Sequence, residues 1–124
     1  MRVAEPDELR THAYPLLMAA ISEAEFARWF PLPFHHVTDP REEPEPSKVA
    51  LLELDGHYVA VFYGERSNHL TLRIPTSTDP VAFLEAFFRE VPLPVSRIVW
   101  RRHDARLPRE ATAAATPSPE HVSR

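Results

Sequence analysis

The sequence predicts a single α+β domain, because a stretch with strand-like alternation and tight turns is flanked by segments with helical signals. Residues 48–74 contain three apolar runs separated by two polar turns, which predicts an antiparallel meander. An aromatic segment with helical spacing follows at 79–91, and a strand-like segment follows at 97–101. The 124 residues are enough for one ordinary domain, which we expect over residues 1–103.

The N-terminal third is expected to be mainly helical. Residues 7–20 place apolar side chains at helical spacing, although Pro15 must kink this helix or begin a second one. A clearer start follows at Ser22, because a serine with glutamate three residues later is the pattern of a capping box. This predicts a second helix over residues 23–30, and residues 34–38 then suit a short edge strand.

The meander is expected to have three strands, at residues 48–54, 57–63 and 69–74. Asp55-Gly56 between the first two is the dipeptide favoured by a type I′ turn, which sets Leu52 opposite Val59. With this register one face of the meander is wholly apolar. The other face, called here the reverse face, mixes apolar and polar residues: Val49, Leu51, Tyr58, Ala60, Phe62, Thr71 and Arg73.

The C-terminal part is expected to cross over the sheet. Asp79-Pro80 is a good N-cap followed by proline at the first helical position, and the broad apolar stripe of residues 79–91 suits a helix lying on a sheet. Such a crossover predicts that strand 97–101 returns parallel to a neighbouring strand. Residues 104–124 are rich in Ala, Thr, Pro and Ser and are expected to form a flexible tail.

The reverse face needs a cover, because soluble monomers usually avoid large exposed apolar patches. Two covers are compatible with the sequence. The N-terminal helices would lie on this face or at its flank and sandwich the sheet, or a second copy of the chain would cover it in a homodimer.

The composition limits the classes of function. The chain has no cysteine, which excludes disulfides, a thiol nucleophile and a cysteine zinc site. Its formal net charge of −4 disfavours general nucleic-acid binding. No apolar run approaches the ~20 residues of a membrane span, and the acidic N-terminus is unlike a signal peptide, so we expect a cytoplasmic protein. Thirteen of the 14 basic residues are arginine, a bias typical of GC-rich bacterial genomes.

The histidines do not predict a metal site. His35 and His36 are adjacent on a strand and therefore point to opposite faces, so they do not converge with Asp39 on one ion. His57 and His69 lie beside turns at opposite ends of the central strand, which places them too far apart to share a metal.

Catalytic and cofactor motifs are also missing from the sequence. Ser67 lies two residues before a histidine, but no strand-to-helix elbow and no oxyanion glycine surround it. Gly56 and Gly64 are the only glycines, which excludes a GxGxxG loop or a P-loop. The sequence therefore predicts a non-enzymatic binding or protein-interaction domain, with no catalytic residue, metal or cofactor.

The candidate binding surface lies on the reverse face and its edge. Its residues are Tyr58, Phe62, Thr71, Arg73 and Arg101. Tyrosine and arginine beside apolar residues are enriched at protein interfaces, which favours a protein partner, either a second copy or another protein. Helices that bury this face would instead leave Arg73 paired with an acid such as Glu53.

Two other functions remain open. A small-molecule-binding protein or cofactor-independent enzyme would have a pocket between the sheet and the N-terminal helices, lined by Trp29, Tyr58, Phe62 and Arg73. A nucleic-acid accessory protein would use Arg97, Arg101 and Arg102 together on one side. Alternation along this last strand instead places Ile98 and Trp100 towards the core, with arginines on its outer face.

Overall fold

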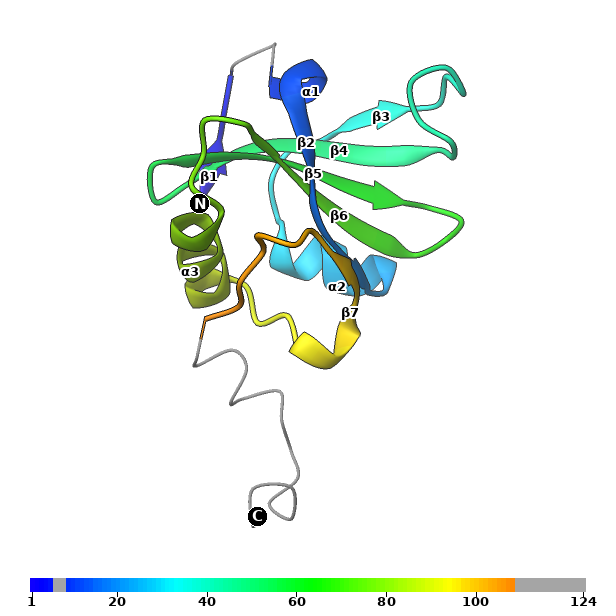
Figure 1. The fold of residues 1–124 in the computed structure, drawn as a ribbon. Coiled ribbons are helices and arrows are strands. Elements are labelled where there is room, and N and C mark those ends of the chain that lie inside the picture. The colour runs from blue at the N-terminus through cyan, green and yellow to red at the C-terminus, as the bar shows by residue number, and fades with distance from the viewer. Residues whose placement is uncertain (6–8, 109–124) are drawn as a thin grey trace.

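The computed structural model describes residues 1–5 and 9–108. In this part of the chain seven strands of unequal length form one antiparallel sheet, with helices on both sides (Figure 1). The strands are β1 (Arg2–Val3), β2 (Ala13–Ala20), β3 (His35–Val37), β4 (Ser47–Leu54), β5 (His57–Gly64), β6 (His69–Pro75) and β7 (Ile98–Arg101). The helices are the one-turn α1 (Leu9–His12), α2 (Glu23–Trp29) and α3 (Pro80–Glu90), with a 3₁₀ turn η1 (Val95–Arg97) before β7. The strand order is β1-β4-β5-β6-β2-β7, and β3 also pairs with β4.

The centre of the sheet is a meander in chain order. β4, β5 and β6 pair consecutively, with Leu52 opposite Val59, the register that the turn sequence predicts. Asp55 and Gly56 have φ angles of 52° and 82°, and a type I′ turn requires positive φ at both central residues.

The prediction of a helix over residues 7–20 is wrong, because helix α1 ends at His12 and β2 begins at Ala13. β2 is inserted between β6 and β7, and this pairing outweighs the local helical preference of its residues. Proline is tolerated in a strand at bulges, and the register of β2 shifts between Pro15 and Leu17.

The prediction that the last strand runs parallel to its neighbour is also wrong, since β7 pairs antiparallel with β2. Both β6 and β7 are antiparallel to β2 and therefore run in the same direction. Helix α3 thus connects two strands of equal direction, but β2 occupies the place between them.

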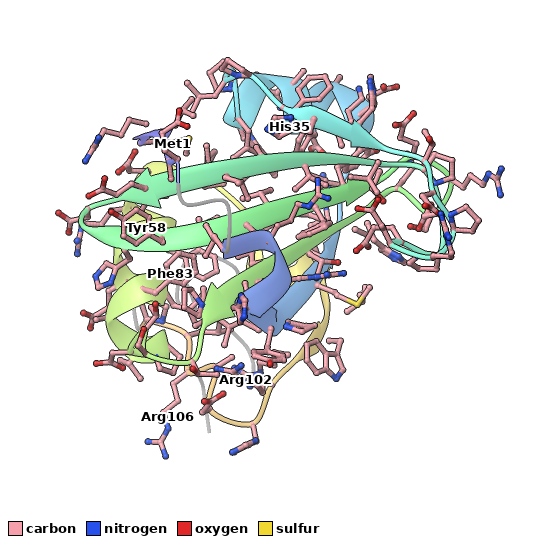
Figure 2. The ribbon with its side chains drawn as sticks, turned by 90° about the horizontal axis from the view of Figure 1, so that it is seen from above. Met1, His35, Tyr58, Phe83, Arg102 and Arg106 are labelled. Atoms are coloured by element: carbon pink, nitrogen blue, oxygen red, sulfur yellow. The ribbon has the colours of Figure 1, made fainter. Side chains whose placement is uncertain are left out.

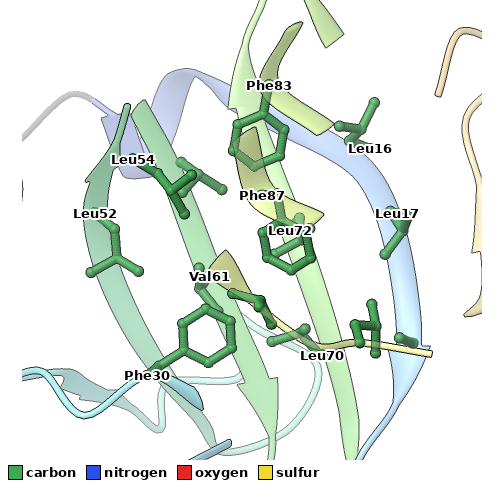
Figure 3. Packing of buried hydrophobic residues seen from close by; sticks show 14 of the residues in the cluster. Leu16, Leu17, Phe30, Leu52, Leu54, Val61, Leu70, Leu72, Phe83 and Phe87 are labelled. Atoms are coloured by element: carbon green, nitrogen blue, oxygen red, sulfur yellow. The ribbon is translucent and has the colours of Figure 1, made fainter. Parts of the chain in front are cut away.

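Helices α2 and α3 cover the same face of the sheet, which corrects the expectation that both N-terminal helices lie opposite α3. Phe30, at the end of α2, lies 6.5 Å from Phe87 of α3 between ring centres. Figure 3 shows the rings of Phe30, Phe83 and Phe87 over the side chains of the sheet, with Phe87 beside Leu72. This layer is the main core, and both helices begin at the predicted caps: Ser22 forms a capping box and Asp79 accepts from the Val81 N–H.

The reverse face has its own smaller core, formed within one chain. Figure 2, seen from this side, shows α1 lying across the strands of the meander. Its cluster of buried residues consists of Leu9, Ala13, Val37, Val49, Ala60 and Phe62. The one-turn helix α1 therefore covers part of the reverse face.

The C-terminal residues that the structure describes also pack on the main core, where Ala105 is buried and Leu107 contacts it. Residues 109–124 of the predicted tail lie outside the described residues. None of the described helices is both long and apolar enough to cross a membrane.

Candidate functional site

One row of paired residues crosses the reverse face from edge to edge. Directly paired residues of antiparallel strands point to the same face, so these side chains form a continuous line. The row runs Trp100, Met18, Thr71, Phe62, Val49 and His35. It passes from a covered half, where Phe62 and Val49 are buried in the smaller core, to a half without such a cover.

The uncovered half of the row, Met18, Thr71 and Trp100, is called here the open strip together with Pro15, which lies opposite Arg73 on the same face. Trp100 is 44% exposed, Pro15 is exposed, and Met18 and Thr71 are half-buried. The expectation that Trp100 faces the core with Ile98 is therefore wrong. The register of β7 shifts between Ile98 and Trp100, so simple alternation fails at this point.

The β7 edge of the open strip does not offer a regular strand for pairing. Ile98 lies opposite Ala19 and Trp100 opposite Met18, so Val99 is an extra residue in β7 and is 56% exposed. Bulges and arginines are devices that discourage edge-to-edge pairing of sheets. Side chains, and not backbone groups, are therefore the contacts that this edge presents best.

The segment 97–106 carries four arginines and one aspartate. Arg97 donates to both carboxylate oxygens of Glu25, and Arg102 binds Asp104 at 2.6 Å. These ion pairs engage two of the three arginines that a nucleic-acid site would require.

A cavity of about 240 Å³ opens in the covered half of the reverse face, between α1, the loop 38–46 and the sheet. Its lining consists of Arg10, Val37, Glu42, Glu43, Phe62 and Arg73. Two ion pairs join residues of this lining: Arg10 to Glu42 at 2.6 Å and Arg73 to Glu43 at 3.0 Å. The pairing of Arg73 with Glu53 that burial was expected to produce is thus replaced by pairing with Glu43.

The predicted surface residues are separated into four places. Phe62 and Arg73 line the cavity, and Thr71 belongs to the open strip. Tyr58 is 41% exposed opposite Glu53 near the other end of the meander, and the exposed Arg101 lies on β7, where it donates to the Ala105 carbonyl.

The lining predicted for a pocket is partly displaced. Trp29 packs against the main core on the opposite side of the sheet, so it cannot share a pocket with Phe62 and Arg73. Met18 was missed because its strand was expected to be a helix. Glu42 and Glu43 were missed because a proline-rich acidic loop gives no sequence signal of where it packs.

The polar groups considered for chemistry have structural partners. The Ser67 hydroxyl donates to Glu45 at 2.6 Å within the turn between β5 and β6. His36 lies 3.7 Å from a carboxylate oxygen of Glu65. Among the described residues no three His, Asp or Glu side chains are grouped as metal ligands.

No known protein family, curated protein or solved structure matches this chain. The fold and the two candidate sites define a small, mainly β, α+β domain with an open apolar strip and a separate charged cavity on one face of its sheet.

Proposed function

We propose that this chain is a non-enzymatic protein-interaction domain, which binds a partner protein through the open strip. The observation that carries the proposal is the exposure of Trp100 beside half-buried Met18 and Thr71, on a face whose other half the chain covers itself. Tryptophan is strongly enriched among the residues that dominate binding energy at protein interfaces.

The charge of β7 and of the residues that follow it favours an acidic partner surface. Arg101 and Arg106 are exposed, and the whole segment 97–106 contains only one acid. Arg101 lies opposite Leu17 and therefore points to the other side of the β7 edge from Trp100. A second copy that covered both sides of this edge would bring the same arginines towards one another, and facing like charges disfavours association. The partner in this proposal is therefore another protein with an acidic surface around an apolar contact, and the homodimer becomes the competing outcome.

The test uses an array of synthetic peptides with several glutamates around one leucine, and matched peptides with lysine in place of glutamate. We expect the acidic peptides to bind the wild type and the lysine peptides not to bind. Trp100→Ser should weaken binding about thirtyfold, the loss of ~2 kcal/mol typical of a hot-spot residue. Tyr58→Ser is the matched control, because Tyr58 is almost equally exposed but lies outside the strip.

Two results would overturn the proposal. One is that neither peptide series binds the wild type, or that the acidic peptides bind Trp100→Ser as tightly as the wild type. The other is a wild-type dimer by light scattering that Trp100→Ser converts to a folded monomer, which would assign the strip to a second copy of the chain.

A further inference from the structure

Arg73 lies in the lining of the charged cavity, and its guanidinium group is held in place by the ring of Phe62. The guanidinium carbon of Arg73 lies 3.9 Å from the centre of the Phe62 ring, the geometry of a cation–π contact. Phe62 is itself buried in the smaller core. The guanidinium group of Arg73 therefore packs on a buried aromatic ring, while 24% of the surface of the Arg73 side chain stays exposed.

The hydrogen-bonding capacity of Arg73 is only partly used. Its Nη2 donates to Glu43 Oε1 at 3.0 Å, whereas its buried Nε has no acceptor among the described residues. A buried donor without an acceptor is costly, and a carboxylate that binds arginine with two parallel hydrogen bonds would satisfy such a donor. Glu43 occupies the guanidinium but leaves this second bond unmade.

The remaining charges of the cavity balance those of Arg73. Arg10 and Glu42 pair at its lip, where the Glu42 side chain is 48% exposed, and Glu43 supplies a second carboxylate. The lining thus holds two cations and two anions, so a ligand with a single charge would leave one lining charge without its counterpart. A ligand with one carboxylate and one ammonium group keeps the balance.

The size of the cavity limits the ligand further. Its volume of about 240 Å³ is below the ~300–1,000 Å³ of pockets for drug-sized molecules. Val37 supplies an apolar wall beside the charged groups.

We propose that this cavity binds a small amino-acid-like zwitterion, with its carboxylate on Nε and Nη2 of Arg73 in place of Glu43 and its ammonium group on the released Glu43. The site uses the covered half of the reverse face and does not depend on the open strip. Its failure and the failure of the interaction proposal are therefore separable.

The test is an NMR titration that follows the Val37 methyl resonances with four free amino acids: glycine, alanine, valine and leucine. Two fragments of leucine are the matched probes, 4-methylpentanoate without the ammonium group and 3-methylbutylamine without the carboxylate. We expect at least one amino acid to bind at concentrations up to about 10 mM, which exceeds even a weak ~1 mM dissociation constant. The best-binding amino acid should bind at least tenfold more tightly than either fragment.

Variants then assign the two charges. Arg73→Lys keeps the cation but loses the two-bond fork, and should weaken binding of the best amino acid at least tenfold. Glu43→Gln should abolish the preference for the zwitterion over 4-methylpentanoate, because the ammonium partner is gone while Arg73 is released. Arg28→Gln, at an exposed position of α2 on the other face of the sheet, is the control and should leave binding unchanged.

Absence of a Val37 shift with all four amino acids in the folded wild type overturns the proposal. So does binding that survives Arg73→Lys in full, or equal affinity of the wild type for the amino acid and both fragments. Spectra of each variant without ligand establish that it is folded, so a loss of binding is not a loss of structure.

Discussion

The guanidinium group of Arg97 donates hydrogen bonds to both carboxylate oxygens of Glu25, at 2.9 and 3.0 Å. This pair joins the turn before β7 to helix α2, so it connects the edge of the sheet to the main core. The same carboxylate accepts the Ser22 backbone N–H at 2.8 Å and completes the capping box of α2. The hydrogen bonds from Arg97, followed by the bond from Ser22, lower the pKa of Glu25 from 4.5 to about 2.

Acid should therefore destabilise the fold through Glu25. A carboxyl whose pKa is lower in the folded chain contributes stability that is complete above its unfolded value, 4.5, and is lost as the pH falls towards about 2. Glu25→Gln should lower the free energy of unfolding at neutral pH by about 0.5–1 kcal/mol, since the charge pairing with Arg97 is lost while the glutamine oxygen still accepts the Ser22 N–H. It should also flatten the fall of stability between these two pKa values, as measured by urea unfolding across this range.

Glu85→Gln is the matched control for this measurement, because Glu85 is an exposed helix glutamate for which the described structure shows no ion pair. It should leave both the stability and its pH slope unchanged. An identical pH slope in the wild type and Glu25→Gln would contradict the assignment of this acid sensitivity to Glu25.

Gly64→Ala should destabilise the turn between β5 and β6. A Cβ atom on Gly64 would overlap the carboxylate of Glu45. That carboxylate accepts the backbone N–H groups of Arg66 and Ser67, both at 2.8 Å. Displacing it should lower the free energy of unfolding by about 1–3 kcal/mol, the usual cost of overpacking, as measured by urea unfolding.

A double-mutant cycle isolates this mechanism. When Glu45→Ala removes the carboxylate, Gly64→Ala should cost at least about 0.5 kcal/mol less than it does in the wild type. Equal costs in both backgrounds would mean that the alanine acts on something other than Glu45. Gly56→Ala is a useful comparison, because no atom lies within 4 Å of its Cβ position and its cost should come from the positive φ of 82° alone.

Those parts of the fold that depend on local chemistry could be predicted from the sequence. The Asp55-Gly56 turn favours one register for the two strands beside it, and that register is the one observed. The caps at Ser22 and Asp79 likewise signal helix starts within a few residues of chain. Such signals need no knowledge of distant segments.

Residues 13–20 could not be assigned in the same way. Their apolar side chains occur in adjacent pairs, such as Leu16 and Leu17, which suit a helix facing a core. In the structure the register shift after Pro15 allows both leucines to be buried in a strand. Only the distant partners β6 and β7 make this arrangement stable, so the sequence around Pro15 does not encode it locally.

The candidate sites show the same division. Strand alternation alone predicts that Phe62 and Arg73 share one face of the sheet, and the two side chains are in contact. Glu43 lies 30 residues from Arg73 in the sequence, and the two meet only because the loop that carries Glu43 folds back over the sheet. Trp100 is exposed because β7 has a bulge before it. The bulge is visible in the pairing of β7 with β2, and the amino-acid composition of β7 does not predict it.

Leu9→Ala tests which group covers the buried half of the reverse face. Leu9 is 5% exposed and packs in the smaller core with Ala60 and Phe62. Truncation should lower the free energy of unfolding by about 2–3 kcal/mol, near the lower end for buried leucines, because a one-turn helix can adjust to fill part of the space. Val81→Ala, at an exposed position of α3, is the control and should change it by less than about 0.5 kcal/mol.

The concentration dependence of unfolding decides between this cover and a second copy of the chain. If α1 alone covers this half of the face, the urea midpoint of the wild type is the same at low and high protein concentration. A subunit that covered it would make the midpoint rise with concentration, because association stabilises only the folded chain. A rising midpoint, together with a small effect of Leu9→Ala, would show that a partner and not α1 protects Phe62 from water.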